Sequence, residues 1–300
     1  MINMLIKCLF ITLVLPSFCL ASIFGIDDRV DFFNIINPKI IELTKSTPSI
    51  MRKENLKLMP DGDYQLVGKS LVDSFNFCED APFATQPLNA NCSSALISKN
   101  TILTAAHCIN KEGLYGMGMD DLYVVFDYKR RNQAQEVYII PKQNVYKLQK
   151  VVYRNFDNSM YKTALDLAIY KLDRETTRKP VKVNTKFNYS SGTRLYALGY
   201  PLGIPQKLTP NGVILDKESS PNSFKHNLDT FSVNSGSPIF DEASNQIIGV
   251  HVRGTGSNYK KYGRNCAEWF KADLEQDYGE ANSLSSLDSV ILNGVLKAKE

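Results

Sequence analysis

Three short segments of the sequence contain the residue types needed for nucleophilic catalysis. His107 ends the segment LTAAH, Asp166 begins the segment DLAI, and Ser235 is the first serine of the segment NSGSP. A serine hydroxyl is a poor nucleophile at neutral pH unless an imidazole takes its proton and a carboxylate orients that imidazole. Each residue alone is more typical of a turn, a cap or a structural histidine. Together and in this order they predict a catalytic triad.

The elements that must position these residues belong to a folded globular chain. The 300 residues are 43% apolar with ordinary glycine and proline contents, which excludes disorder, collagen and coiled coil. The formal net charge is +4, and the charged residues form no long runs of one sign. The densest basic cluster, at residues 129–131, is typical of a solvated turn, so no nucleic-acid partner is expected.

The first 21 residues have the pattern of a secretory signal peptide. Lys7 precedes an apolar run, residues 8–15, that is too short to span a bilayer, and Ala21 is the expected cleavage site. No later run is apolar enough for a transmembrane helix. We therefore expect a secreted or periplasmic protein without a stable membrane span.

Six cysteines are present, and two of them, Cys8 and Cys19, lie in the expected signal peptide. The remaining four are Cys78, Cys92, Cys108 and Cys266. An even number of cysteines in an exported chain indicates disulfides, and four cysteines allow three pairings. None of the spacings is typical of a zinc or redox site.

Short apolar runs separated by turns dominate the chain from about residue 92. Runs of this kind predict an all-β barrel or sandwich. The expected strands are residues 94–98, 101–104, 122–126, 136–140, 146–153, 167–172, 194–198, 212–215, 238–240 and 247–252. Apolar residues at roughly helical spacing in 267–277 and 284–297 predict a short helical tail.

The three segments resemble the motifs of the trypsin-like serine peptidases, and most of all those of the bacterial glutamyl endopeptidase branch. TAAHC around His107 matches the histidine motif of the family, and DLA at Asp166 is similar to its aspartate motif. NSGSP around Ser235 matches the bacterial serine motif, in which Asn precedes the nucleophile. The resemblance covers about residues 78–272. A weaker resemblance, at residues 23–29, is to the mature start of some bacterial members.

The resemblance implies two six-stranded antiparallel β-barrels with the triad in the cleft between them. The chain is then divided into a signal peptide, an N-terminal extension or prosegment, two barrel lobes and a tail. These parts are residues 1–21, 22–70, 71–176, 177–275 and 276–300. The resemblance also implies a disulfide between Cys92 and Cys108, which leaves Cys78 to pair with Cys266.

The resemblance further implies a primary pocket that binds an acidic side chain. Thr230 and His251 match the positions that line this pocket in glutamyl endopeptidases, so we expect cleavage of proteins or peptides after Glu or Asp. Protonation of His251 is expected to strengthen binding, so that the preference for Glu over Gln narrows as pH rises. The alternative is that His251 is a half-buried strand residue, and we interpret His226 as a structural residue in a loop. Three residues after His251 are expected to line the substrate cleft, namely Val252, Arg253 and Gly254.

Two residues depart from the family pattern. Asn234 cannot form the ion pair with a new N-terminus that activates animal trypsins. Val233 replaces the usual glycine whose N–H, together with that of Ser235, forms the oxyanion hole. A β-branched residue is unfavourable at positive φ, and loss of one oxyanion donor costs roughly 10²–10³ in rate. The leading prediction is an active, monomeric serine endopeptidase that needs no metal or cofactor, and the rival is a catalytically silent homologue that binds a protein partner.

Overall fold

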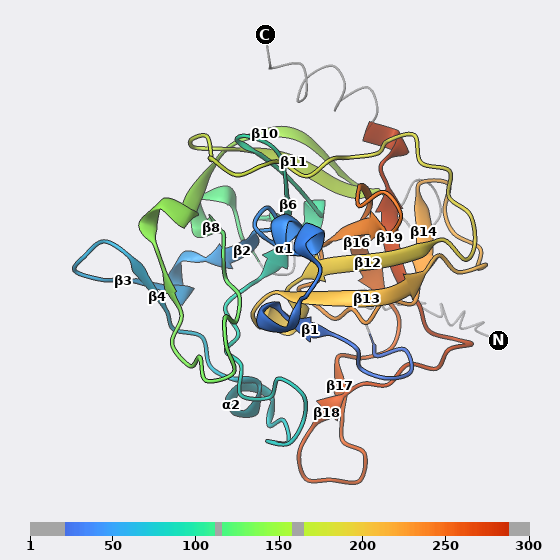
Figure 1. Cartoon of the computed structure of the whole chain (residues 1–300), viewed down its shortest axis with the longest axis horizontal. Helices are drawn as coiled ribbons and strands as arrows, with labels where there is room; N and C mark the ends of the chain where they lie inside the picture. Colours follow the sequence, from blue (N-terminus) through green and yellow to red (C-terminus); the bar gives the residue numbers. More distant parts are fainter. Residues whose placement is uncertain (1–21, 112–115, 158–164, 288–300) are drawn as a thin grey trace, which may run out of the picture.

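The computed structural model describes residues 22–111, 116–157 and 165–287, and strands dominate it. Two large antiparallel sheets with barrel-like curvature lie side by side (Figure 1). This arrangement confirms the expected all-β, two-barrel fold, although each sheet has seven strands and not the expected six. The expected signal peptide, residues 1–21, lies outside the described residues.

The first sheet has seven strands in the order β5-β2-β8-β10-β11-β7-β6. Its strands are β2 (Ser49–Arg52), β5 (Cys92–Ser93), β6 (Ala95–Ser98), β7 (Thr101–Thr104), β8 (Leu122–Val125), β10 (Val145–Phe156) and β11 (Asp166–Leu172). Strands β6 and β7 form a hairpin around the turn at residues 99–100, as expected. Six of the seven residues of β11 are buried, because β10 and β7 pair with it on both sides and its side chains fill the barrel core.

The second sheet also has seven strands, in the order β1-β13-β12-β15-β16-β19-β14. Its strands are β1 (Val30–Asp31), β12 (Arg194–Gly199), β13 (Lys207–Val213), β14 (Ser223–His226), β15 (Pro238–Asp241), β16 (Ile247–Gly254) and β19 (Gly279–Ser283). A buried ion pair joins its first two strands, since Lys207 Nζ lies 2.7 Å from Asp31 Oδ1. Burial lowers the pKa of Lys207 to about 8, although Asp31 favours its charged form.

Smaller elements complete the fold. Two minor sheets consist of β3 (Leu56–Leu58), β4 (Tyr64–Leu66) and β9 (Ile139–Ile140), and of β17 (Tyr259–Lys260) and β18 (Glu268–Trp269). The helices are α1 (Pro38–Thr44) and α2 (Leu71–Phe75), with 3-10 turns η1 (Phe32–Asn34), η2 (Lys53–Asn55), η3 (Ala106–Cys108), η4 (Met119–Asp121), η5 (Lys142–Asn144), η6 (Pro201–Gly203) and η7 (Ser285–Leu287). Among the described residues, no helix is long and apolar enough to cross a membrane.

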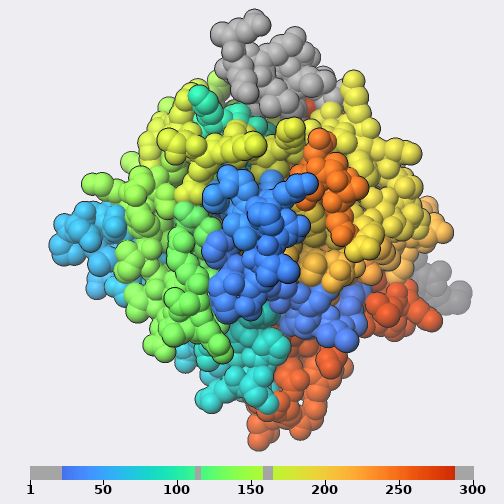
Figure 2. Space-filling view, viewed as in Figure 1, coloured from blue at the N-terminus to red at the C-terminus, as the bar shows by residue number. Residues whose placement is uncertain are grey.

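Helix α1 and its neighbouring residues lie across the junction of the two sheets. The helix begins at Pro38 because the Asn37 side chain accepts a hydrogen bond from the Lys39 amide and proline suits the first helical turn. After the helix, the Thr47 carbonyl accepts bonds from the side chains of Tyr200 and Gln206, both at 2.8 Å. Figure 2 shows this blue N-terminal segment covering the centre of one face, between the green and the orange parts of the chain.

The structure places both ends of the described chain differently from the expected division. Residues 22–70, expected as a separate extension, supply β1 to the second sheet and β2 to the interior of the first. Residues 276–300, expected as a tail, supply β19 to the second sheet. The helix expected at 267–277 is absent, because β18 pairs with β17 there and turns follow it. The helix expected at 284–297 is reduced to η7 over its described residues.

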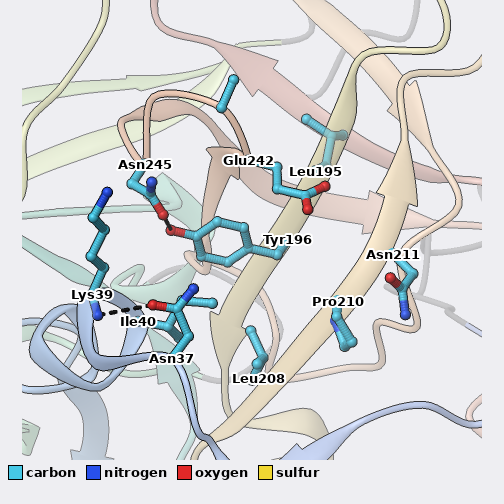
Figure 3. Close-up of a pocket in the computed structure, with 11 residues that line it drawn as sticks. Asn37, Lys39, Ile40, Leu195, Tyr196, Leu208, Pro210, Asn211, Glu242 and Asn245 are labelled. Carbon is cyan, nitrogen blue, oxygen red and sulfur yellow. Dashed lines mark hydrogen bonds between the residues drawn. The ribbon is translucent and has the colours of Figure 1, made fainter.

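A cavity of about 300 Å³ lies between α1 and the second sheet (Figure 3). Ile40 of α1 lines one side of it, and Tyr196 of β12 and Leu208 of β13 line the other. The Tyr196 hydroxyl is already occupied, since it donates to Asn245 Oδ1 at 2.9 Å. None of the three predicted triad residues lines this cavity.

Candidate active site

His107 lies at the end of the β6–β7 hairpin, in the single 3-10 turn η3 that follows β7. Its neighbour Cys108 forms a disulfide with Cys92 at the start of β5. A ring nitrogen of His107 and the two cysteine sulfurs lie within 4.8 Å of one another. Because the two sulfurs are bonded to each other, they offer no thiolate to a metal. The disulfide instead lies beside the imidazole. The second expected disulfide, Cys78–Cys266, is also present.

Asp166 holds His107 at two points. Its Oδ2 lies 2.5 Å from the ring Nδ1, and its Oδ1 accepts the His107 backbone N–H at 2.9 Å. Strand β11 makes this possible, because Asp166 is its first residue and β11 pairs with β7, the strand that leads to His107. A carboxylate acceptor places the imidazole proton on Nδ1 and leaves Nε2 as the basic nitrogen. Burial opposes ionisation of Asp166, but His107 outweighs it, so the pKa of Asp166 lies below its ordinary value.

Ser235 is held beside the same disulfide by strand β5. Its carbonyl accepts the Ser93 N–H at 2.8 Å, and Ser93 directly follows Cys92. The next residue, Gly236, has a φ of +85° and donates its N–H to the His251 carbonyl at 2.8 Å. A Cβ at Gly236 would lie 2.0 Å from the Ser93 carbonyl oxygen, so only glycine fits. The loop before β15 is thus joined to the sheet that positions His107.

Two peptide groups near Ser235 are oriented by bonds to their carbonyls. The Ser232 carbonyl accepts the Leu202 N–H at 2.7 Å, and the Asn234 carbonyl accepts the Ser237 N–H at 2.8 Å. In a trans peptide the N–H points opposite to the C=O of the same unit. The N–H groups of Val233 and Ser235 therefore point away from Leu202 and Ser237, respectively.

Val233 has the backbone conformation that the sequence suggested would be strained. Its φ is +73°, in the left-handed region that β-branched residues rarely occupy. Its carbonyl accepts a hydrogen bond from the Ser93 hydroxyl at 3.0 Å. The valine thus has the positive φ that suits a glycine, and a neighbouring side chain bonds its carbonyl.

His251, an expected pocket residue, is the end of a chain of hydrogen bonds that runs through His226. The Leu228 N–H donates to Nδ1 of His226 at 3.2 Å, so the proton of a neutral His226 is on Nε2. That Nε2 lies 3.1 Å from Nδ1 of His251, which must accept, so the proton of His251 is on its own Nε2. Within the described part of the chain, this Nε2 has no hydrogen-bond partner. The buried Thr230 hydroxyl also lacks a partner there.

Comparison with known proteins decides the family. A model of the family described as the trypsin-like peptidase domain matches residues 92–250, more than half of the chain, with all three predicted triad residues inside the match. The chain belongs to the trypsin-like peptidases. No curated protein matches the sequence of this trypsin-like peptidase.

A solved structure supports the fold, and a second is reported beside it. A Glu endopeptidase in complex with MPD superposes with a TM-score of 0.52 at 17% identity, covering 90% of this chain and 97% of that one. The VesB protease of Vibrio cholerae gives a TM-score of 0.47 at 14% identity. The match covers 82% of this chain and 63% of the VesB chain. At 17% identity, the likeness to the Glu endopeptidase shows the fold of this trypsin-like peptidase and not its specificity.

Burial changes the expected pH behaviour of the pocket in this trypsin-like peptidase. Desolvation holds the pKa of His251 well below its ordinary value, and the nearby His226, His107 and Arg253 lower it further. Burial also lowers the pKa of His226 to about 3. His251 is therefore neutral at neutral pH, and the expected strengthening of Glu binding by its protonation stays a prediction. His226 lies in strand β14 and not in the expected loop.

Two residues near the pocket were not predicted from the sequence. Asp229 Oδ1 accepts the Phe24 N–H at 2.7 Å, and burial raises the pKa of this carboxyl to about 7. The Arg29 guanidinium lies over Phe231 and over Trp269, 4.6 and 4.0 Å from the ring centroids. Asp28 precedes Arg29 and Asp31 follows it two residues later, and such acidic neighbours do not predict that the arginine is buried. The weak resemblance at residues 23–29 was the one sequence signal for this contact.

Proposed function

We propose that this trypsin-like peptidase is an active, secreted serine endopeptidase. In the proposed mechanism, Ser235 Oγ attacks the scissile carbonyl carbon while its proton passes to Nε2 of His107. The ionised Asp166 stabilises the imidazolium, which then gives the proton to the leaving amine. A water molecule, deprotonated by His107 in turn, hydrolyses the resulting acyl ester. The observation that carries the proposal is the two-point hold of Asp166 on His107.

The surrounding peptide groups support the electrostatic part of this mechanism. The N–H groups of Val233 and Ser235 are the proposed donors to the oxyanion, because bonds to Leu202 and Ser237 orient their peptide groups. Secretion is supported by two disulfides, which persist in oxidising compartments and are rare in reducing ones.

A fluorophosphonate probe tests the proposed activity, because it reacts only with an activated serine. We expect wild-type protein to be labelled on Ser235 and the Ser235→Ala variant to stay unlabelled. Ser237→Ala is the matched control, since Ser237 belongs to the same segment but is fully buried. An unlabelled wild type would favour the silent homologue that binds a protein partner.

We further propose that the pocket prefers Glu, with Asp second. The Nε2–H of His251 and the hydroxyl of Thr230 are two donors with no hydrogen-bond partner among the described residues, and a carboxylate accepts both. The positive charge of Arg253 also favours a bound carboxylate. It lies near enough to the site to lower the pKa values of both Asp166 and His251. Val252 and Gly254, which flank Arg253 in β16, are the proposed edge of the substrate site.

A peptide-library digest tests this specificity. Wild-type enzyme is expected to cleave after Glu, and His251→Ala is expected to lose this preference while fluorophosphonate labelling of Ser235 persists. Cleavage after Lys, Arg or large apolar residues in the wild type would refute the pocket assignment. A Glu preference that survives His251→Ala would move its cause to another residue, with Arg253 the next candidate.

A further inference from the structure

The left-handed conformation of Val233 needs a cause outside Val233 itself. Glycine adopts a φ of +73° readily, but valine is crowded there between its Cβ and the backbone. The N–H of Val233 is one of the two proposed oxyanion donors, so a relaxation of this residue would turn that donor away. Some other group must therefore hold the loop in place.

Ser93 is the residue whose contacts meet this need. Its hydroxyl donates to the Val233 carbonyl at 3.0 Å and accepts the Tyr200 N–H at 3.2 Å. Its own N–H donates to the Ser235 carbonyl at 2.8 Å. Ser93 is fully buried, so water does not compete for these bonds. One residue of the first sheet thus bonds the carbonyls of both residues whose N–H groups form the proposed hole.

We infer that the Ser93 hydroxyl is a positioning group for the oxyanion hole, holding Val233 in the conformation that places its N–H. The inference rests on the proposed peptidase function. Because the Tyr200 N–H occupies an acceptor site of the hydroxyl, the hydroxyl proton is directed at the Val233 carbonyl. The hydroxyl acts through Val233 and touches no substrate. Its loss therefore weakens binding of the transition state more than binding of the substrate.

The chain offers a matched control in the adjacent residue. Ser94 is also fully buried, but its hydroxyl donates to the Pro48 carbonyl at 2.9 Å, away from the loop that contains Ser235. Ser94→Ala removes one buried hydroxyl bond, to the Pro48 carbonyl. Ser93→Ala removes the bond to the Val233 carbonyl and also the bond from the Tyr200 N–H. Only the second variant therefore loses a bond that reaches Val233.

The experiment compares Ser93→Ala, Ser94→Ala, Val233→Gly and the double variant Ser93→Ala/Val233→Gly. We expect Ser93→Ala to lower kcat and the rate of fluorophosphonate labelling about 10- to 100-fold, part of the effect of a lost oxyanion donor, with KM within about twofold. We expect Ser94→Ala to stay within about threefold of wild type. The double variant should recover to near the rate of Val233→Gly, because glycine needs no support at positive φ.

Hydrogen exchange of the amides in residues 229–237 supplies a readout that does not depend on activity. Faster exchange is expected in Ser93→Ala and not in Ser94→Ala. Equal labelling rates in these two variants, or no recovery in the double variant, would overturn the inference and leave the peptidase proposal intact. If the wild type is not labelled at all, the peptidase proposal fails. In that case the hydrogen-exchange rates still test the role of Ser93, because equal rates in Ser93→Ala and Ser94→Ala would show that its hydroxyl does not hold Val233.

Discussion

Asp229 and Phe24, which are 205 residues apart in sequence, are joined by a hydrogen bond of 2.7 Å from the Phe24 amide to the Asp229 carboxyl. The other carboxyl oxygen is buried without a hydrogen-bond partner among the residues that the structure describes. Burial raises the pKa of Asp229 to about 7; the Phe24 bond and Arg29 oppose this rise, and Asp28 and Asp27 add to it. The folded protein therefore favours the neutral carboxyl, and ionisation of Asp229 destabilises it.

Asp229→Asn is expected to change how stability depends on pH. A raised carboxyl pKa contributes stability that is complete below the unfolded pKa of about 4 and is lost as pH rises through 7. Asparagine keeps an acceptor for the Phe24 amide and does not ionise. The unfolding free energy of the variant minus that of the wild type should therefore be roughly 2–4 kcal/mol larger at pH 8 than at pH 5. Thermal unfolding across this range measures the difference, with the exposed Asp120→Asn as control. A difference that is the same at both pH values would contradict the prediction.

Asp166→Asn is expected to lower kcat about 10⁴-fold without unfolding the protein. An asparagine amide can donate to Nδ1 of His107, and the proton of the imidazole then moves to Nε2, where it blocks the base. The measurement is kcat for a peptide substrate together with the melting temperature. Asp173→Asn, just beyond the other end of β11, is the matched exposed control and should retain activity. A loss of less than tenfold in Asp166→Asn would argue against the proposed role.

His226→Leu is expected to weaken the Glu preference while leaving the chemical step intact. Without the Nε2–H of His226, nothing fixes the proton of His251 on the side that faces away from His226. The ratio of kcat/KM for matched Glu and Ala peptides should fall about tenfold, the value of one hydrogen bond. His226→Gln, which keeps an N–H donor, should lose less. If both variants keep the wild-type ratio, His226 has no part in specificity.

The two disulfides are expected to differ in their effect on activity. Their loops span 16 and 188 residues, and the chain-entropy model gives about 3 and about 5 kcal/mol of stabilisation. Replacing either pair by alanine should lower the melting temperature. Only loss of Cys92–Cys108 should also lower kcat/KM at a temperature where both variants are folded, because this bond adjoins His107 and Ser93. An equal loss of activity in both variants would count against a local role.

The candidate triad residues could be named from the sequence because each lies in a short motif. His107, Asp166 and Ser235 are recognised from five or six neighbouring residues, and the hairpin of β6 and β7 from a local turn. The residues that hold these groups in place were not predictable. The contacts of Ser93 and His226 run between the barrels and across a sheet, and no local pattern distinguishes these residues from other buried polar residues.

The same limit explains the errors at the two ends of the chain. Strand β2 has only four residues, and its place between β5 and β8 depends on long-range pairing. Strand β19 has the sequence GEANS, which lacks β-branched residues and alternation, and is a strand because β16 and β14 flank it. The apolar spacing at 267–277 indicated a helix, but β18 pairs with β17 at the start of this segment and turns follow it.

The strand order of the second sheet also determines when that barrel can form during synthesis. Strand β1 is made early, yet it must wait for β13, and the space between β14 and β16 stays open until residues 279–283 have been made. A nascent chain that stops before Gly279 therefore exposes two facing edges with unpaired backbone groups, which favour aggregation. The second barrel is therefore completed only once residues 279–283 have been synthesised, after every other strand of its sheet.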